Sequence, residues 1–302
     1  FSKQEEMEKK TSSISLKTLF YLYLFIFGGL AIIGSIVIVL MVYLFKTMNF
    51  ADILSFAQNA YHSGLLLFVL FGFFAQMIDG TLGMAYGVSS TSFLISTGIS
   101  PAIASASVHA AEIFTTGISG ISHWRFKNLD KKLFIQLAIP GVIGSALGAY
   151  VLSSFQGDIL KPIINVYLLL MGFRILYSAL RKKIMARKFK QYTVLGLLGG
   201  FVDASGGGGW GPVVTTTLVG TGETPRVTIG TVNTAEFLVT LASTGVFTMV
   251  IGLSHWHIIV GLILGGMIAA PLAAFLCNKI NARWAMVLVG ILIMALSIRT
   301  LL

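Results

Sequence analysis

Charged side chains are scarce in this chain: only 11% of its 302 residues are Asp, Glu, Lys or Arg, while 56% are apolar. Soluble domains carry roughly 25% charged residues, so this composition excludes an ordinary soluble globular protein. It also excludes intrinsic disorder, which requires low hydrophobicity and high net charge. Cysteine is nearly absent as well, and the single Cys277 excludes a disulfide framework and a cysteine-rich metal site.

Acidic residues are the scarcer charge, with 11 Asp and Glu against 21 Lys and Arg, which gives a net charge of +10. The polar surface is too small for a nucleic-acid-binding protein, so basic loops facing anionic lipid explain the excess better. The apolar runs are continuous and do not alternate with polar residues, which favours helices over a β-barrel. We therefore expect an all-α polytopic membrane protein in the inner or plasma membrane, with no cofactor and no metal.

The apolar segments divide the chain into an N-terminal part and two similar halves. Residues 1–18 are expected to form a cytoplasmic tail, 19–45 an extra transmembrane helix, and 46–63 an interfacial linker. A first repeat then covers 64–180, a basic cytoplasmic loop 181–190, and a second repeat 191–302. The segments expected to be helical are 64–78, 88–97, 101–121, 133–153 and 161–180 in the first repeat, and 191–202, 212–221, 225–251, 257–277 and 283–302 in the second.

An offset of 124 residues superimposes the two repeats. It places Asp79 on Asp203, Gly83 on Gly207, Gly87 on Gly211, Pro101 on Pro225 and Glu112 on Glu236. Shared hydrophobicity does not explain identity at acidic, glycine and proline positions, so we infer an internal duplication.

The short segments of each repeat decide whether the second repeat is inverted. Segment 212–221 has 10 residues, about 15 Å of helix, which is half a bilayer. If each repeat contains a re-entrant hairpin and the N-terminus is cytoplasmic, 17 of the 21 Lys and Arg lie inside and 3 outside, whereas two full crossings give at best 12 against 8. The positive-inside rule therefore favours seven transmembrane helices plus two re-entrant helical hairpins; nine full spans are the alternative.

Four acidic residues lie within the apolar segments: Asp79, Glu112, Asp203 and Glu236. A charged group inside a membrane costs at least ~2.5–3.5 kcal/mol, so it usually faces a cavity or a partner. Their matched positions in the two repeats indicate a shared site, in which these acids couple transport to protons or support the core structurally. His109 precedes Glu112 by three residues, on the same helix face, and is a candidate partner in proton handling.

The two glycine-rich stretches, 79–87 and 203–211, are expected to bend the chain within the membrane. A bend that ends where a helix starts presents unpaired N–H groups and the positive end of the helix dipole, which bind anions without Lys or Arg. Tight helix packing in lipid is the alternative role for these glycines. The predicted substrate-binding residues are Thr81, Gly83, Gly87, Ser89, Ser205, Gly207, Gly208, Gly209, Trp210, Gly211, Thr215 and Asn233.

These bends, the proline after the second one and the duplicated layout resemble the TauE/SafE sulfite exporter family, also called the toluene sulfonate uptake permease family. The resemblance covers roughly 64–302, with 206–212 as one glycine-rich motif and 80–87 as a degenerate first copy. It implies transport of sulfur-containing anions such as sulfite, thiosulfate or organosulfonates. The first bend departs from the family's run of three glycines, which puts equal anion contact by both repeats in question.

The function that these observations favour is secondary transport of a small sulfur-containing anion, with proton coupling and rocking of one repeat against the other as hypotheses. Three other classes stay open: a passive anion channel, an intramembrane serine hydrolase that pairs Ser205 with a histidine, and a structural subunit that does not transport. Arg174, inside a span, is interpreted as a snorkelling side chain or as the partner of an acid or anion. The expected partners are the anion and lipid, and oligomeric state is left open.

Overall fold

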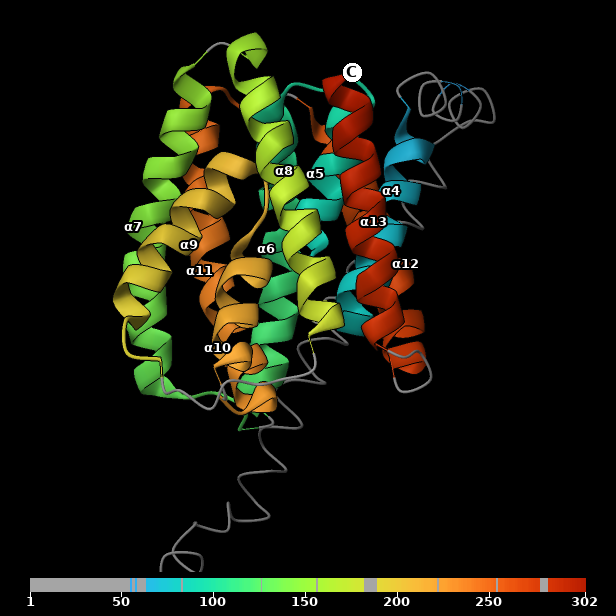
Figure 1. Ribbon diagram of the computed structural model, residues 1–302. Coiled ribbons are helices and arrows are strands. Elements are labelled where there is room, and N and C mark those ends of the chain that lie inside the picture. Colours follow the sequence, from blue (N-terminus) through green and yellow to red (C-terminus); the bar gives the residue numbers. More distant parts are fainter. Residues whose placement is uncertain are drawn as a thin grey trace, which may run out of the picture. The chain divides into compact units, whose positions relative to one another are not determined.

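The computed structural model describes residues 64–82, 84–125, 127–155, 157–181, 189–221, 223–253, 255–277 and 282–302, together with Ser55 and Gln58. The expected cytoplasmic tail, the extra transmembrane helix, nearly all of the linker and most of the basic loop lie outside these residues. Within the described part of the chain, every regular element is a helix (Figure 1). The all-α expectation is therefore confirmed.

The helices follow the expected order closely. The first repeat contains α4 (Leu65–Leu82), α5 (Tyr86–Ser96), α6 (Pro101–Arg125), α7 (Lys131–Ser154) and α8 (Gly157–Leu180). The second contains α9 (Tyr192–Gly206), the π-helical turn η1 (Gly211–Thr215), α10 (Thr216–Gly220), α11 (Pro225–Val250), α12 (Trp256–Cys277) and α13 (Ala282–Leu301).

Local signals explain several of these boundaries. Pro101 and Pro225 occupy the first position of α6 and α11, where a missing N–H costs nothing. Asp130 caps α7, because its Oδ1 accepts hydrogen bonds from the N–H groups of Lys132 and Leu133 at 2.8 and 3.0 Å. Helix starts are therefore well marked in this sequence.

The bends are shorter than expected from the glycine-rich stretches. Helix α4 continues past Asp79 to Leu82, and α9 continues past Asp203 to Gly206. Helix α9 ends where Gly207 takes a left-handed conformation with φ of 75°, and the Gly207 N–H caps the carbonyl of Asp203. Glycine inside a helix is only weakly unfavourable, so the chain leaves the helix at the left-handed residue and not at the first glycine.

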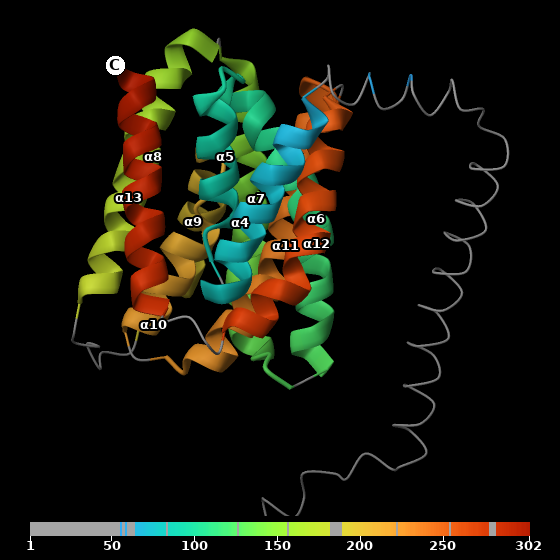
Figure 2. The same cartoon turned by 90° about the vertical axis from the view of Figure 1, so that its right-hand side faces the viewer.

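Helices α4 and α5 form one hairpin, and α9 with η1 and α10 forms another. Figures 1 and 2 show that α4 and α5 open toward the end of the bundle where the C-terminus lies, whereas α9 and α10 open toward the opposite end. We call this opposite end the basic end, since Arg125, Lys131 and Arg181 lie at helix termini there. The two hairpins thus enter the bundle from opposite ends, as an inverted repeat predicts.

The two repeats are not separate domains, because the most extensive helix pairs join one repeat to the other. Helix α4 packs along α12, α9 packs along α7, and the pairs α6–α11 and α8–α13 also cross between repeats. One hydrophobic cluster unites Leu137 of α7 with Trp210, Leu218 and Val239 of the second repeat. Each hairpin therefore packs against a long helix of the other half of the chain.

Small residues allow these crossed pairs to approach closely. A Cβ on Gly200 of α9 would overlap the backbone of Gly141 on α7, and a Cβ on Gly72 of α4 would overlap that of Leu262 on α12. Close backbone approach at small residues is the usual device of helix packing in lipid. The glycines at these crossings therefore serve packing.

The outward faces of the bundle are apolar. Ile139 and Ile143 on α7, and Ile163 and Leu170 on α8, are all more than half exposed. By length and composition, two helices of the described residues can cross a membrane, Lys131–Ser154 and Ile159–Leu180. An apolar belt of this size suits a lipid environment.

Candidate functional site

The tips of the two hairpins touch near the middle of the bundle. Gly208 lies against the backbone of Gly87 and Val88, and its φ of 124° suits glycine alone. The hydroxyl of Thr91 donates a hydrogen bond to the carbonyl oxygen of Gly207, so the first hairpin also holds the second bend. The tip-to-tip contact consequently depends on Gly208, which has no side chain, and on the hydroxyl of Thr91.

An aspartate closes the second bend. Oδ1 of Asp203 accepts a hydrogen bond from the N–H of Trp210 at 2.8 Å. Asp79 and Tyr86 are the matched pair in the first repeat, since the same offset of 124 residues relates them to Asp203 and Trp210. The Asp203 carboxylate thus occupies the positive end of a half-helix, the position that an anion would take.

A small cavity lies between the hairpins and the two crossing helices α6 and α11. It is lined by Asp79, Ala85, Tyr86, Gly87, Val88, Glu112, Thr115, Thr116, Asp203, Gly209, Gly211, Pro212 and Glu236. The space open to the centre of a water molecule is about 20 Å³, which is room for roughly one water. In this conformation the cavity is therefore closed to a sulfur oxyanion.

Asp79, Glu112, Asp203 and Glu236 all line this cavity, so the fold brings the four core acids together. Glu112 of α6 is 3% exposed, and its Oε2 has no hydrogen-bond partner among the described residues. Burying an ionised carboxylate without donors is expensive. The position therefore favours a bound proton or cation.

His109 forms a buried pair with Asp203, not with Glu112. Its Nε2 lies 3.1 Å from Asp203 Oδ2, with side-chain exposures of 0% and 2%. Its Nδ1 lies 2.8 Å from the carbonyl oxygen of Ser105, which can only accept, so Nδ1 carries a proton. A hydrogen bond between Nε2 and Oδ2 requires one further proton, and the pair is electrically neutral whichever of these two atoms carries it.

The predicted substrate-binding residues divide into two groups. Gly87, Gly209 and Gly211 line the central cavity. Ser89, Ser205, Gly207, Gly208, Trp210, Thr215 and Asn233 do not line it. Gly83 lies outside the described residues, as does the side chain of Thr81. The role of these residues in anion binding stays a prediction.

Several of the residues away from the cavity have partners elsewhere. Trp210 is fully buried and its Nε1–H donates to the carbonyl of Val232 at 3.1 Å. Asn233 Nδ2 donates to Ser119 Oγ at 3.1 Å, which joins α11 to α6. Ser205 Oγ donates to the Phe201 carbonyl of its own helix at 2.7 Å. These bonds are structural in the conformation seen here.

Sequence reasoning missed three polar contributors to the cavity wall, Tyr86, Thr115 and Thr116. Tyr86 was detectable, because it precedes Gly87 as Trp210 precedes Gly211 in the other repeat. Thr115 and Thr116 lie one turn after Glu112 and donate hydrogen bonds to its carbonyl oxygen. Threonines one turn from a buried acid are a usable signal, since they share its helix face.

Arg174 of α8 holds the π-helical turn. Its Nε donates to the carbonyl of Pro212 at 2.8 Å, and its Nη2 donates to Thr217 Oγ1 at 2.7 Å. A π-helical turn shifts the backbone hydrogen bonds by one residue and often marks a functional position. The sequence suggested that Arg174 snorkels or pairs with an acid or anion. In the structure its guanidinium instead donates to carbonyl and hydroxyl oxygens.

Broken helices that enter an apolar bundle from opposite ends and meet at buried carboxyls define the class of this protein: it is a membrane transporter. The chain belongs to the sulfite exporter TauE/SafE family, whose model matches residues 68–300. It is 47% identical over 247 residues to a probable membrane transporter protein, YtnM of Bacillus subtilis (strain 168), across 78% of this chain and 82% of that protein. No solved structure matches.

Proposed function

We propose that this chain is a secondary transporter of small sulfur-containing anions, such as sulfite, thiosulfate or an organosulfonate, coupled to protons. Membership of the sulfite exporter family supports the class of substrate. The buried carboxyls around the hairpin tips support the coupling. Protonation of these acids would remove their repulsion of an anion, so the anion and protons would occupy the centre together.

The proposed topology has seven transmembrane helices and two re-entrant hairpins, with the N-terminus in the cytoplasm. Its support is the geometry of the hairpins, which return to the end of the bundle from which they start (Figure 2). Helix α5 has 11 residues, about 17 Å of helix, which is too short to cross a bilayer core of about 30 Å. In this topology the basic end faces the cytoplasm.

The packing of helices between the repeats favours a moving body other than one whole repeat for alternating access. Rocking of one repeat against the other would break the crossed pairs α4–α12 and α7–α9. Moving the cluster of α7, α9, η1, α10 and α11 as one body keeps the α7–α9 pair and the α4–α12 pair intact, and of the extensive helix pairs only α6–α11 must slide. We propose that this group moves against the remaining helices, and that the Gly87–Gly208 contact lies at the sliding surface.

The unpartnered carboxyl oxygen of Glu112 carries this proposal and gives its test. Replacing Glu112 with glutamine keeps the size of the side chain and removes its titratable proton. We expect uphill uptake of radiolabelled thiosulfate, driven by a pH gradient in proteoliposomes, to fall at least tenfold, while the variant remains folded. Glu236→Gln, at the matched position, is expected to behave in the same way.

The matched control is Glu223→Gln. Glu223 lies at the basic end, accepts a hydrogen bond from Tyr192 at 2.8 Å and does not line the central cavity. Normal accumulation by the Glu112 variant would refute its role in coupling. Equally fast thiosulfate flux with and without a pH gradient in the unmodified protein would refute coupled transport in favour of a passive channel.

A further inference from the structure

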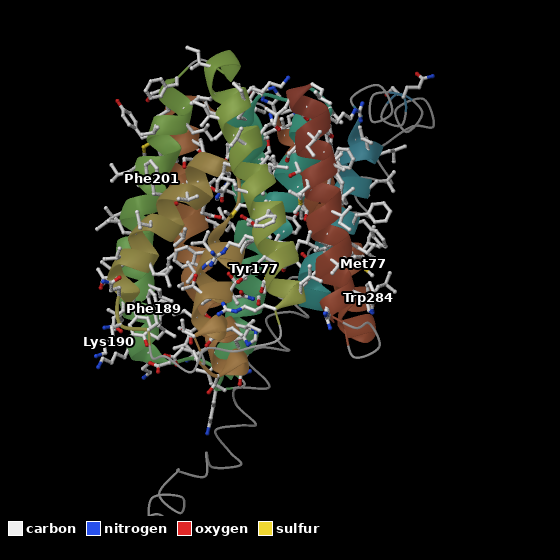
Figure 3. The ribbon with its side chains drawn as sticks, viewed as in Figure 1. Met77, Tyr177, Phe189, Lys190, Phe201 and Trp284 are labelled. Atoms are coloured by element: carbon white, nitrogen blue, oxygen red, sulfur yellow. The ribbon has the colours of Figure 1, made fainter. Side chains whose placement is uncertain are left out.

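A second cavity lies at the basic end, between α8, α10 and α13, with a volume of about 310 Å³. Its polar wall comes from Arg174, Tyr177 and Ser178 of α8, from Arg181 directly after α8 and from Thr216, and its apolar wall includes Met286. Figure 3 labels Tyr177 on α8, within the turn that follows Arg174. We call this cavity the arginine pocket. A volume near 300 Å³ is typical of sites for small ligands.

The arginine pocket and the central cavity have opposite charges. Arg174 and Arg181 are seven residues apart on α8, which places both on one helix face. Among the described residues that line the arginine pocket, none is acidic. The central cavity instead is lined by four carboxyls. Of these two cavities, the arginine pocket is therefore the one whose charge attracts an anion.

Arg174 connects the arginine pocket to the second hairpin. Its Nε and Nη2 hold Pro212 and Thr217, whereas its Nη1 makes no hydrogen bond within the described part of the chain. The same guanidinium can therefore hold the half-helix and still offer N–H donors to a ligand. Planar guanidinium donors match the oxygen atoms of an oxyanion.

We propose that the arginine pocket is a binding site for the transported sulfur oxyanion, distinct from the central cavity. This inference rests on the proposed function.

The walls of the arginine pocket also define the ligand. The guanidinium groups at one side bind the oxygen atoms, and Met84, Val219 and Met286 offer apolar surface for a carbon-bound group. An organosulfonate uses both surfaces, whereas inorganic sulfite or thiosulfate uses only the first. Organosulfonates with a short apolar group are therefore expected to bind more tightly than sulfite.

The test is equilibrium binding of thiosulfate and of ethanesulfonate to the purified full chain, combined with uptake of both anions in proteoliposomes. Arg181→Gln is the main variant, since Arg181 follows the end of α8 and takes no part in holding η1. We expect its dissociation constants to rise roughly three- to tenfold at low ionic strength, where exposed charges act most strongly. Arg174→Lys, which keeps the charge and loses the planar donors, is expected to weaken binding as well.

Lys190→Gln is the matched control for loss of one positive charge at the basic end. Figure 3 shows Lys190 near the start of α9, to the side of α7, and it does not line the arginine pocket. Its dissociation constants are expected to equal those of the unmodified chain. Parallel loss of affinity in Lys190→Gln and Arg181→Gln would overturn the proposal, because general surface charge would then explain both.

A lipid phosphate offers the same oxyanion chemistry as a sulfonate, so binding is measured in nanodiscs of neutral lipid and of anionic lipid. Affinity that is weakened by Arg181→Gln in neutral nanodiscs supports the site for the sulfur anion. If Arg181→Gln alters only the retention of anionic lipid, the proposal is overturned in favour of a lipid site. Absence of uptake by the unmodified chain would refute the proposed function itself, whereas normal uptake with unchanged affinity in Arg181→Gln would refute the arginine pocket alone.

Discussion

Replacing Gly208 with alanine is expected to abolish transport and to destabilise the folded protein more than any other single methyl addition in the bend. Its φ of 124° lies where side chains rarely fit, which costs about 1–3 kcal/mol by itself. The new Cβ would also overlap the backbone of Gly87 and Val88, which has no flexible atom that can move away. The hairpin tips must then separate, and the central cavity loses its shape.

The measurement compares thermal unfolding in detergent and thiosulfate uptake in proteoliposomes. Gly245→Ala is the control, because Gly245 lies inside α11 and a Cβ there meets nothing within 4 Å. This control is expected to retain uptake and to gain slightly in stability, since alanine is the better helix former. A Gly208→Ala protein with an unchanged unfolding temperature and normal uptake would show that the tips do not touch as described.

Removing either member of the His109–Asp203 pair is expected to destabilise the protein by about 3–5 kcal/mol, because the remaining group stays buried without its partner. Asp203→Ala removes the acceptor of the Trp210 N–H as well. The double variant, His109→Ala with Asp203→Ala, is expected to cost far less than the sum of the two single changes, since both break the same interaction. Denaturant unfolding of all three variants measures this coupling.

Asp203→Asn separates the structural role of this residue from its role in proton transfer. An amide oxygen can still accept from Trp210, and an amide nitrogen can donate to His109 Nε2, so the fold is expected to survive. Transport driven by a pH gradient is nevertheless expected to fail, because the proton between Asp203 and His109 can no longer be exchanged. Additive costs in the double variant, or full uptake by Asp203→Asn, would contradict the shared-proton pair.

Much of the helical framework could be predicted from the sequence, because the signals are local. Uninterrupted apolar runs, Pro101, Pro225 and the Asp130 cap set helix boundaries that lie within a few residues of those expected. The repeat offset paired Asp79 with Asp203, and both line the same central cavity in the structure. Matched sequence positions here correspond to matched geometry.

Contacts between distant segments could not be predicted in the same way. Spacing along α6 placed His109 beside Glu112, yet His109 reaches Asp203 on another helix. Nothing in the sequence around Arg174 indicates that its partners lie on η1 and α10, which come after α9 in the chain. The hydroxyl of Tyr167 donates to the carbonyl of Gly208 at 2.7 Å. This contact could not be predicted from the glycines of the second bend either.

Because helices of one repeat pack against helices of the other, the first repeat cannot complete its packing until the second has been synthesised. Helix α4 begins at Leu65, but its main packing partner α12 begins only at Trp256. At ribosomal speeds of about 5–20 residues per second, the first hairpin waits roughly 10–40 s for that partner to leave the ribosome. During this interval lipid headgroups, the insertion machinery or a chaperone must cover its polar bend. Biogenesis of this transporter therefore depends on protecting an incomplete first half.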